Sequence, residues 1–289
     1  MPTARQPARR RAGTVSCPAC SAEHRSCEHR PLSLLAWFKG LFGAPTVPLD
    51  PDTWLRVRAR LPWANSLAPE RDARLCALTA LFLRSKAITP VEGLDLEPDD
   101  RVLLAALCCL PLIEFGKEGL RGWSQLIVYP DTIRIERRYD DVYEPETLDV
   151  AHEWTDEVDG EAWENGPLLL SWADILEELR DPRGGGCLPV HEMAHKLDML
   201  DGALDGTPPL PREWQRQWAQ DFQRAYETFV QRVDRGRRVR LDVQAADSPD
   251  EFFAVCSECH FTRPEVLRRD MPEVAAHLSR FYGDFALGG

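Results

Sequence analysis

The sequence has no apolar run long enough to cross a bilayer. The apolar segment at residues 32–42 (LSLLAWFKGLF) is short and is interrupted by Lys39 and Gly40, whereas a membrane-spanning helix needs about 20 apolar residues. The arginine-rich start is not followed by an apolar segment with a small-residue cleavage site, so we expect no secretory signal. We therefore expect a protein without a membrane span.

The chain also lacks an excess of positive charge. The chain has 35 Lys and Arg residues against 47 Asp and Glu residues, which gives a formal net charge of −12. No overall positive field draws in phosphate groups, so we expect no direct nucleic-acid partner. The arginines gathered in residues 1–30 are an exception, and we interpret that stretch as a solvated, disordered leader.

The cysteines lack the pattern of a disulfide framework. Their number, nine, is odd, and Cys76, Cys108 and Cys109 lie in apolar stretches with helical spacing. Buried reduced thiols fit this pattern better than disulfides do, so we expect a cytoplasmic protein.

Histidine is rare, with seven residues in the chain, yet two of them stand four residues apart in the motif His191-Glu192-Met193-Ala194-His195. In an α-helix, positions four apart share one face, so both imidazoles reach the same cation. Zinc favours such nitrogen ligands. Glu192, beside the first histidine, is placed to act as the general base of a metallopeptidase.

A catalytic zinc site needs a third protein ligand, and no histidine follows His195 at a suitable spacing. The best stretch is residues 250–258, which contains Glu251 and Glu258. Seven residues separate these two glutamates, so on a helix they share a face but stand about 10 Å apart. We expect that one of them binds the metal and that the other accepts a hydrogen bond from a ligating histidine.

The pattern of apolar residues predicts an α+β fold that is mostly helical, with a small central β-sheet. Asp99 and Asp100 are expected to begin one of the helices and Pro111 to bend or end it. The predicted strands cover residues 125–129 and 132–136, and residues 164–171 contain another short strand. The predicted helices cover residues 54–61, 71–86, 102–112, 172–180, 188–200, 211–232, 249–262 and 272–282.

Several motifs carry a family resemblance. The segments HEMAHKLDMLDG and SPDEFFAVCSE, together with VYPDT, GPLLLSW and RFYGD, resemble the Mlc titration factor A family of zinc peptidases from roughly residue 50 to the end. That family is similar to the catalytic domain of anthrax lethal factor. The resemblance implies a zincin-like fold and a gluzincin-like site, with Glu251 as the third zinc ligand beside His191 and His195.

The chain departs from the family pattern at several positions. Gln244 stands where the family commonly has a tyrosine near the zinc, Cys187 stands where it usually has asparagine, and Cys259-His260 replaces an aromatic pair. The tyrosine hydroxyl would stabilise an oxyanion, and an amide at residue 244 is a weaker donor for that purpose.

The resemblance implies two functions. The first is zinc-dependent hydrolysis of peptide bonds, including aminopeptidase-type activity, in which zinc polarises the peptide carbonyl and lowers the pKa of its water. Glu192 then takes up the proton and passes it to the leaving amine. The alternative is a regulatory binding protein that sequesters a Mlc-like transcriptional repressor with little turnover. The expected partners are therefore a peptide or protein substrate and a repressor of that kind.

The N-terminal segment has metal-binding residues of its own. We divide the chain into an N-terminal extension, residues 1–45, and a peptidase domain, residues 46–289. Two interpretations of the extension remain, a small structural zinc site or a disordered thiol-rich tail. The candidate ligands of this second zinc are Cys17, Cys20, His24, Cys27 and His29.

Overall fold

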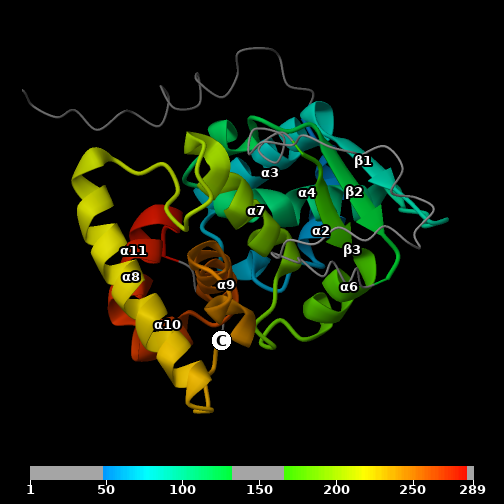
Figure 1. Ribbon diagram of the computed structural model, residues 1–289. Coiled ribbons are helices and arrows are strands. Elements are labelled where there is room, and N and C mark those ends of the chain that lie inside the picture. The colour runs from blue at the N-terminus through cyan, green and yellow to red at the C-terminus, as the bar shows by residue number, and fades with distance from the viewer. Residues whose placement is uncertain (1–47, 132–165, 285–289) are drawn as a thin grey trace, which may run out of the picture. The chain divides into compact units, whose positions relative to one another are not determined.

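The structure is a computed structural model, and it describes residues 48–131 and 166–284 (Figure 1). Both ranges belong to one compact unit. The helices of this part of the chain are α2 (Pro51–Arg58), α3 (Pro69–Ser85), α4 (Pro98–Cys109), α6 (Trp172–Arg180), α7 (Leu188–Asp198), α8 (Arg212–Asp234), α9 (Pro249–Thr262), α10 (Pro264–Asp270) and α11 (Pro272–Tyr282). Short 3-10 helices lie between them, at η1 (Ala64–Ser66), η2 (Leu110–Leu112), η3 (Lys117–Leu120), η4 (Met199–Asp201) and η5 (Val243–Ala246).

A small parallel sheet lies among the helices. Its strands are β1 (Ala87–Pro90), β2 (Gln125–Tyr129) and β3 (Leu168–Ser171), in the order β1-β2-β3. Ala87 pairs with Gln125, and Leu126 pairs with Leu168. Parallel neighbours need a crossover connection, and α4 lies in the one between β1 and β2. The described part of the chain is thus mostly helical with a small sheet, as the sequence predicted.

Helix α7 occupies the middle of the molecule. It packs against α4, α6 and strand β3 and, most extensively, against α9. Figure 1 shows α7 between the sheet and the helices α8, α10 and α11. Almost every residue of α7 is therefore buried, and a pair of polar side chains on this helix is enclosed rather than solvated.

An aromatic cluster fixes α9 in place. The Trp218 ring on α8 stacks on the Phe222 ring with 4.3 Å between centroids, and Phe253 on α9 meets Trp218 edge-on at 5.9 Å. Stacked and edge-on rings add stabilisation beyond the area they bury. These ring contacts hold α9 against α8.

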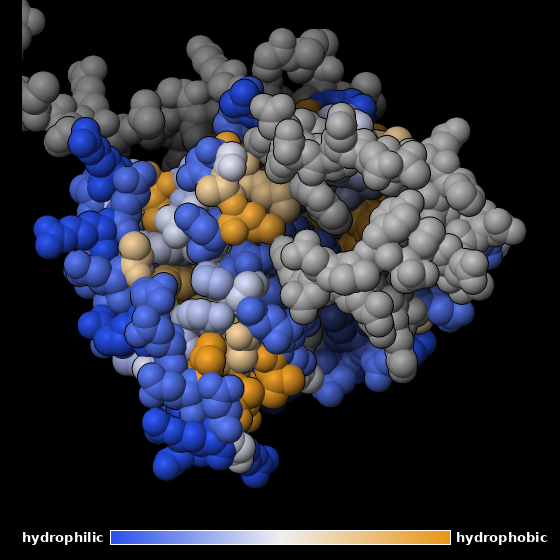
Figure 2. Space-filling view, in the orientation of Figure 1, coloured by the Kyte–Doolittle hydropathy of each residue, from blue (hydrophilic) through white to orange (hydrophobic). Residues whose placement is uncertain are grey.

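The polar surface carries few large apolar residues. In the part of the chain that the structure describes, the large apolar residues in the exposed class are Leu55, Leu204 and Val243. Figure 2 shows a face that is mostly hydrophilic, with small separate apolar patches. None of the described helices is both long and apolar enough to cross a membrane.

The predicted elements compare closely with the observed ones. Strand 125–129 and helices 172–180, 249–262 and 272–282 have the predicted bounds, and Pro111 lies where α4 has given way to η2. Two elements, β1 and α10, were not predicted, and the predicted strand 132–136 lies outside the described residues. Cys108 and Cys109 are buried as expected, and Cys76 is partly buried.

Candidate metal centre

The first two candidate ligands lie one turn apart on α7. Their side chains are enclosed, with His191 5% and His195 3% exposed. Pro189 stands in the first turn of this helix, where its missing N–H costs nothing. At the other end Gly202 adopts φ +89°, and its N–H binds the Met199 carbonyl oxygen at 3.0 Å. A left-handed glycine of this kind ends the helical segment.

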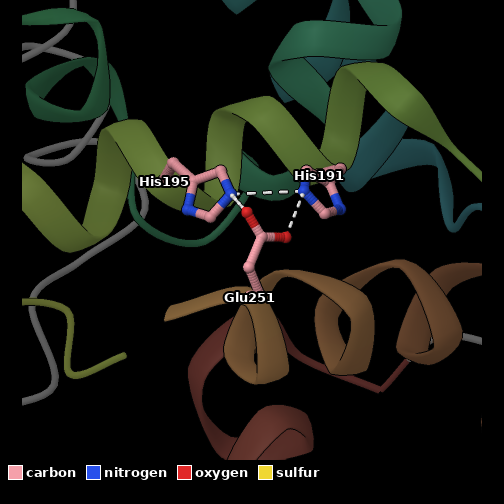
Figure 3. A group of neighbouring side chains, drawn as sticks. All are labelled: His191, His195 and Glu251. Atoms are coloured by element: carbon pink, nitrogen blue, oxygen red, sulfur yellow. Dashed lines mark hydrogen bonds and ion pairs between the residues drawn. The ribbon is translucent and has the colours of Figure 1, made fainter. Parts of the chain in front are cut away.

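The third candidate ligand comes from the first turn of α9. Ser248 caps this helix, because its Oγ accepts a hydrogen bond from the Glu251 N–H at 3.3 Å. Serine followed three residues later by glutamate is typical of a capping box. Here the Glu251 carboxylate faces the two histidines of α7 (Figure 3) and is 5% exposed.

The three side chains meet at distances that suit a zinc ion. The two Nε2 atoms are 3.2 Å apart, and the Glu251 oxygens lie 3.1 Å from His191 Nε2 and 3.5 Å from His195 Nε2. Ligand atoms around tetrahedral zinc, with bonds of about 2.0 Å, stand about 3.3 Å apart. Two imidazoles and a carboxylate are also a donor set that zinc accepts. The cluster therefore fits the metal in both spacing and chemistry.

The charges in the cluster are strongly coupled. Burial lowers the pKa of His191, but hydrogen bonds to Glu251 and Glu258 outweigh burial and raise it to about 10. Burial raises the pKa of the Glu251 carboxyl, but the two histidines lower it by more, so it lies well below its usual range. The raised pKa favours a proton on His191, and a cation that binds the cluster has to displace this proton.

Glu258 supports the first ligand from behind. Its Oε1 lies 2.7 Å from His191 Nδ1, and its Oε2 accepts a hydrogen bond from the Cys187 N–H at 2.6 Å. A carboxylate on Nδ1 leaves Nε2 as the nitrogen that faces the cluster and fixes the orientation of the ring. Of the two glutamates that the sequence offered, the structure brings Glu251 to both histidines and Glu258 to the back of one.

Two further contacts were not foreseen from the sequence. The Gln244 amide donates a hydrogen bond to Glu251 Oε2 at 2.8 Å. Both Glu178 oxygens accept from the Leu188 N–H, at 3.0 and 2.9 Å, and so cap α7 from α6. Burial raises the pKa of the Glu178 carboxyl to about 8. The only sequence feature that singled out Gln244 was its position seven residues before Glu251. Nothing in the sequence pointed to Glu178.

Glu192 lies beside the enclosed cluster and is itself partly exposed. Its charge is close enough to favour the protonated form of His191. The N-terminal cluster of Cys17, Cys20, His24, Cys27 and His29 lies outside the described residues.

Among the residues that the structure describes, one group of side chains could hold a metal ion. It consists of His191, His195 and Glu251, which are buried and whose candidate ligand atoms all lie within 4.8 Å of one another. Comparison with known proteins identifies relatives of this chain. Mlc titration factor A from Escherichia fergusonii is 32% identical over 226 residues, which cover 77% of this chain and 83% of that protein. The protein of the same name from Cronobacter sakazakii is 30% identical, over 82% of this chain and 88% of the relative.

The family comparison covers nearly all of the described residues. The chain matches the glucose-regulated metallo-peptidase M90 family over residues 43–283. This range contains the helix with both histidines, the helix with Glu251 and the three described strands. The protein therefore belongs to the glucose-regulated metallo-peptidase M90 family.

Proposed function

We propose that this protein is a zinc-dependent peptidase that hydrolyses peptide bonds, with His191, His195 and Glu251 as metal ligands and Glu192 as general base. The observation that carries this proposal is the spacing of the three ligand side chains, 3.1 to 3.5 Å, inside a buried cluster. Membership of a metallo-peptidase family supports it.

Each residue of the cluster has a separate task in this proposal. A bound zinc ion supplies Lewis acidity, which polarises a peptide carbonyl and makes a water a stronger acid. Glu192 accepts the proton of the attacking water and later delivers it to the leaving amine. Glu258 keeps His191 oriented through its Nδ1, and Gln244 holds one oxygen of Glu251.

The proposal is tested by replacing the base without touching the ligands. We expect Glu192→Gln to bind as much zinc as the wild type and to lose peptide hydrolysis by at least about 100-fold, because the proton acceptor is gone. Zinc content is measured by elemental analysis, and turnover with a fluorogenic peptide library. Glu213→Gln, an exposed carboxylate on α8, is the matched control and should keep full activity. Equal activity in Glu192→Gln and in this control would refute the assignment of the base.

We also propose that cleavage is of the aminopeptidase type. An aminopeptidase requires a free α-amino group, so peptides with an acetylated N-terminus should resist cleavage while the free peptides are cut. Cleavage sites located by mass spectrometry decide this. Cuts in the interior of acetylated peptides would overturn the aminopeptidase assignment and leave the zinc peptidase assignment standing.

A second candidate function comes from the relatives. Two of the most similar of them carry the name Mlc titration factor A, so we propose a transcriptional repressor of the Mlc kind as a binding partner. The Glu192→Gln variant separates the two functions, because binding does not require a general base. If the variant binds the repressor as tightly as the wild type and neither protein cleaves a peptide, the binding function replaces the peptidase function.

A further inference from the structure

The second histidine of the cluster lacks the support that the first one has. His191 Nδ1 has the Glu258 carboxylate at 2.7 Å, whereas His195 Nδ1 is buried without a hydrogen-bond partner. Figure 3 shows one ring nitrogen of His195 turned to Glu251 and the other turned away from it. A buried donor without an acceptor costs roughly 1–3 kcal/mol, so this nitrogen requires an explanation.

Metal binding at His195 Nε2 would require a proton on His195 Nδ1. Both Nε2 atoms face Glu251, and a metal ligated there takes the lone pair of His195 Nε2. A neutral imidazole carries its single proton on the other nitrogen, so His195 Nδ1 becomes an N–H donor. The buried position therefore demands an acceptor in the metal-loaded protein.

One carboxylate stands just beyond hydrogen-bonding distance. Asp250 Oδ2 lies 3.8 Å from His195 Nδ1, and Asp250 is only 6% exposed. A water that bridges two polar atoms holds them about 4.6 Å apart with bonds of about 2.8 Å, so this gap is too short for a bridging water. A direct bond needs an approach of about 0.8 Å to reach the usual distance near 3.0 Å.

A second buried carboxylate, that of Asp198, lies on α7 itself, three residues beyond His195. Its Oδ2 accepts a hydrogen bond from the Gly206 N–H at 2.7 Å, and its Oδ1 is buried without a hydrogen-bond partner. Among the ion pairs of the described residues, His195 Nδ1 is matched with Asp250. Asp250 is thus the acceptor that the packing of α9 on α7 offers.

We propose that Asp250 accepts a hydrogen bond from His195 Nδ1 in the metal-loaded protein and is the positioning residue of the second ligand. The inference rests on the proposed zinc centre. Helix α9 would then supply one ligand, Glu251, and the acceptors behind both histidines, Asp250 and Glu258. A single rigid element would set all three ligand orientations, because the capped first turn of α9 carries two of these carboxylates.

The test measures zinc affinity rather than activity. Wild type, Asp250→Ala and Asp250→Asn are titrated with Zn²⁺ at pH 7.5 against a chromogenic chelator. We expect Asp250→Ala to bind zinc about 10- to 100-fold more weakly, the usual loss when such an acceptor is removed. Asp250→Asn keeps an acceptor oxygen and should recover most of that loss. Asp247→Asn, an exposed aspartate three residues away, changes the same charge and should bind like the wild type.

A spectroscopic readout distinguishes positioning from general destabilisation. In zinc-loaded protein labelled with nitrogen-15 histidine, the His195 Nδ1–H should give a proton resonance protected from exchange in the wild type and in Asp250→Asn. This measurement on the wild type keeps the proposal testable even if Asp250→Ala does not fold. An unprotected His195 Nδ1–H in the zinc-loaded wild type would overturn the inference, as would zinc affinity in Asp250→Ala within about threefold of wild type. A wild type that binds no zinc at the cluster would remove the proposed function together with the inference, whereas tight zinc binding by every variant removes the inference alone.

Discussion

Glu258 binds two donors at once, one on a side chain and one on the backbone. Its two oxygens meet His191 Nδ1 and the Cys187 N–H, which belongs to the residue just before α7. It therefore orients a candidate ligand, His191, and helps to cap the helix that carries this residue. Removal of this one carboxylate should affect both the metal and the fold.

We expect Glu258→Ala to weaken zinc binding by at least about 10-fold, because His191 loses the acceptor that orients its ring. The same change should lower the free energy of unfolding by about 2 kcal/mol or more, since two buried donors lose their partner. Chelator competition measures the first effect and urea unfolding the second. Glu258→Gln keeps one acceptor oxygen and should lie between the two proteins. Unchanged zinc affinity in Glu258→Ala would show that the carboxylate has no orienting role.

At the residue scale, sequence spacing predicted part of this site. The helical period alone places His191 and His195 on one face, because their separation is a single turn. The same argument could not choose between Glu251 and Glu258, which share a helix face, and the choice rested on the family resemblance. Glu178 and Gln244 bond partners ten and seven residues along the chain, each on the next element. How two successive elements fold onto each other leaves no periodic signal in a sequence.

At the scale of elements, the first turn of α9 decides where Glu251 points. Ser248 fixes this turn through the Glu251 N–H, and Pro249 fits its first position. We expect Ser248→Ala to lower the free energy of unfolding by about 1 kcal/mol, because the cap is lost. Urea unfolding measures this change. Ser248→Thr keeps the hydroxyl and should remain near the wild type, so equal loss in both variants would contradict a capping role.

Two elements escaped sequence analysis for reasons of length and context. Strand β1 has four residues and follows α3 almost directly, so no alternation of apolar and polar residues can develop. It is defined by pairing with β2, which lies far along the chain. Helix α10 has seven residues, fewer than periodicity needs, and is confined between Arg263 and Met271. The longer amphipathic segments were predicted with small shifts at their ends.

At the scale of the whole molecule, a histidine in the interior makes stability depend on pH. Burial lowers the pKa of His260 to about 4. The hydrogen bond between its Nε2 and the Gly283 carbonyl oxygen raises the pKa, but by less than burial lowers it. Its ring contacts those of Phe261 and Tyr282, so it packs in the manner of an aromatic residue. The unfolded chain takes up this proton near pH 6.5, and the folded chain does not until about pH 4.

The sign of the effect follows from this difference. As pH falls from 6.5 toward 4, the unfolded state binds more protons, so the free energy of unfolding decreases. We expect His260 to remove roughly 2 kcal/mol of stability between pH 7.5 and pH 5. His260→Phe should lack this part of the acid sensitivity. Its free energy of unfolding, relative to that of the wild type, should therefore be higher at pH 5 than at pH 7.5. Parallel pH profiles of the two proteins in urea unfolding would contradict the assignment.

In the proposed function, one buried cluster binds the zinc with which the protein hydrolyses peptides. The most direct test of this function is to strip metal from the wild type and from Glu251→Ala with a chelator, remove the chelator and follow peptide hydrolysis while zinc is added back. Activity should vanish on stripping and return with zinc in the wild type but not in Glu251→Ala at the same zinc concentrations, because the third ligand is missing. Hydrolysis that persists in metal-free wild type, or that returns equally in Glu251→Ala, would contradict this account of the site.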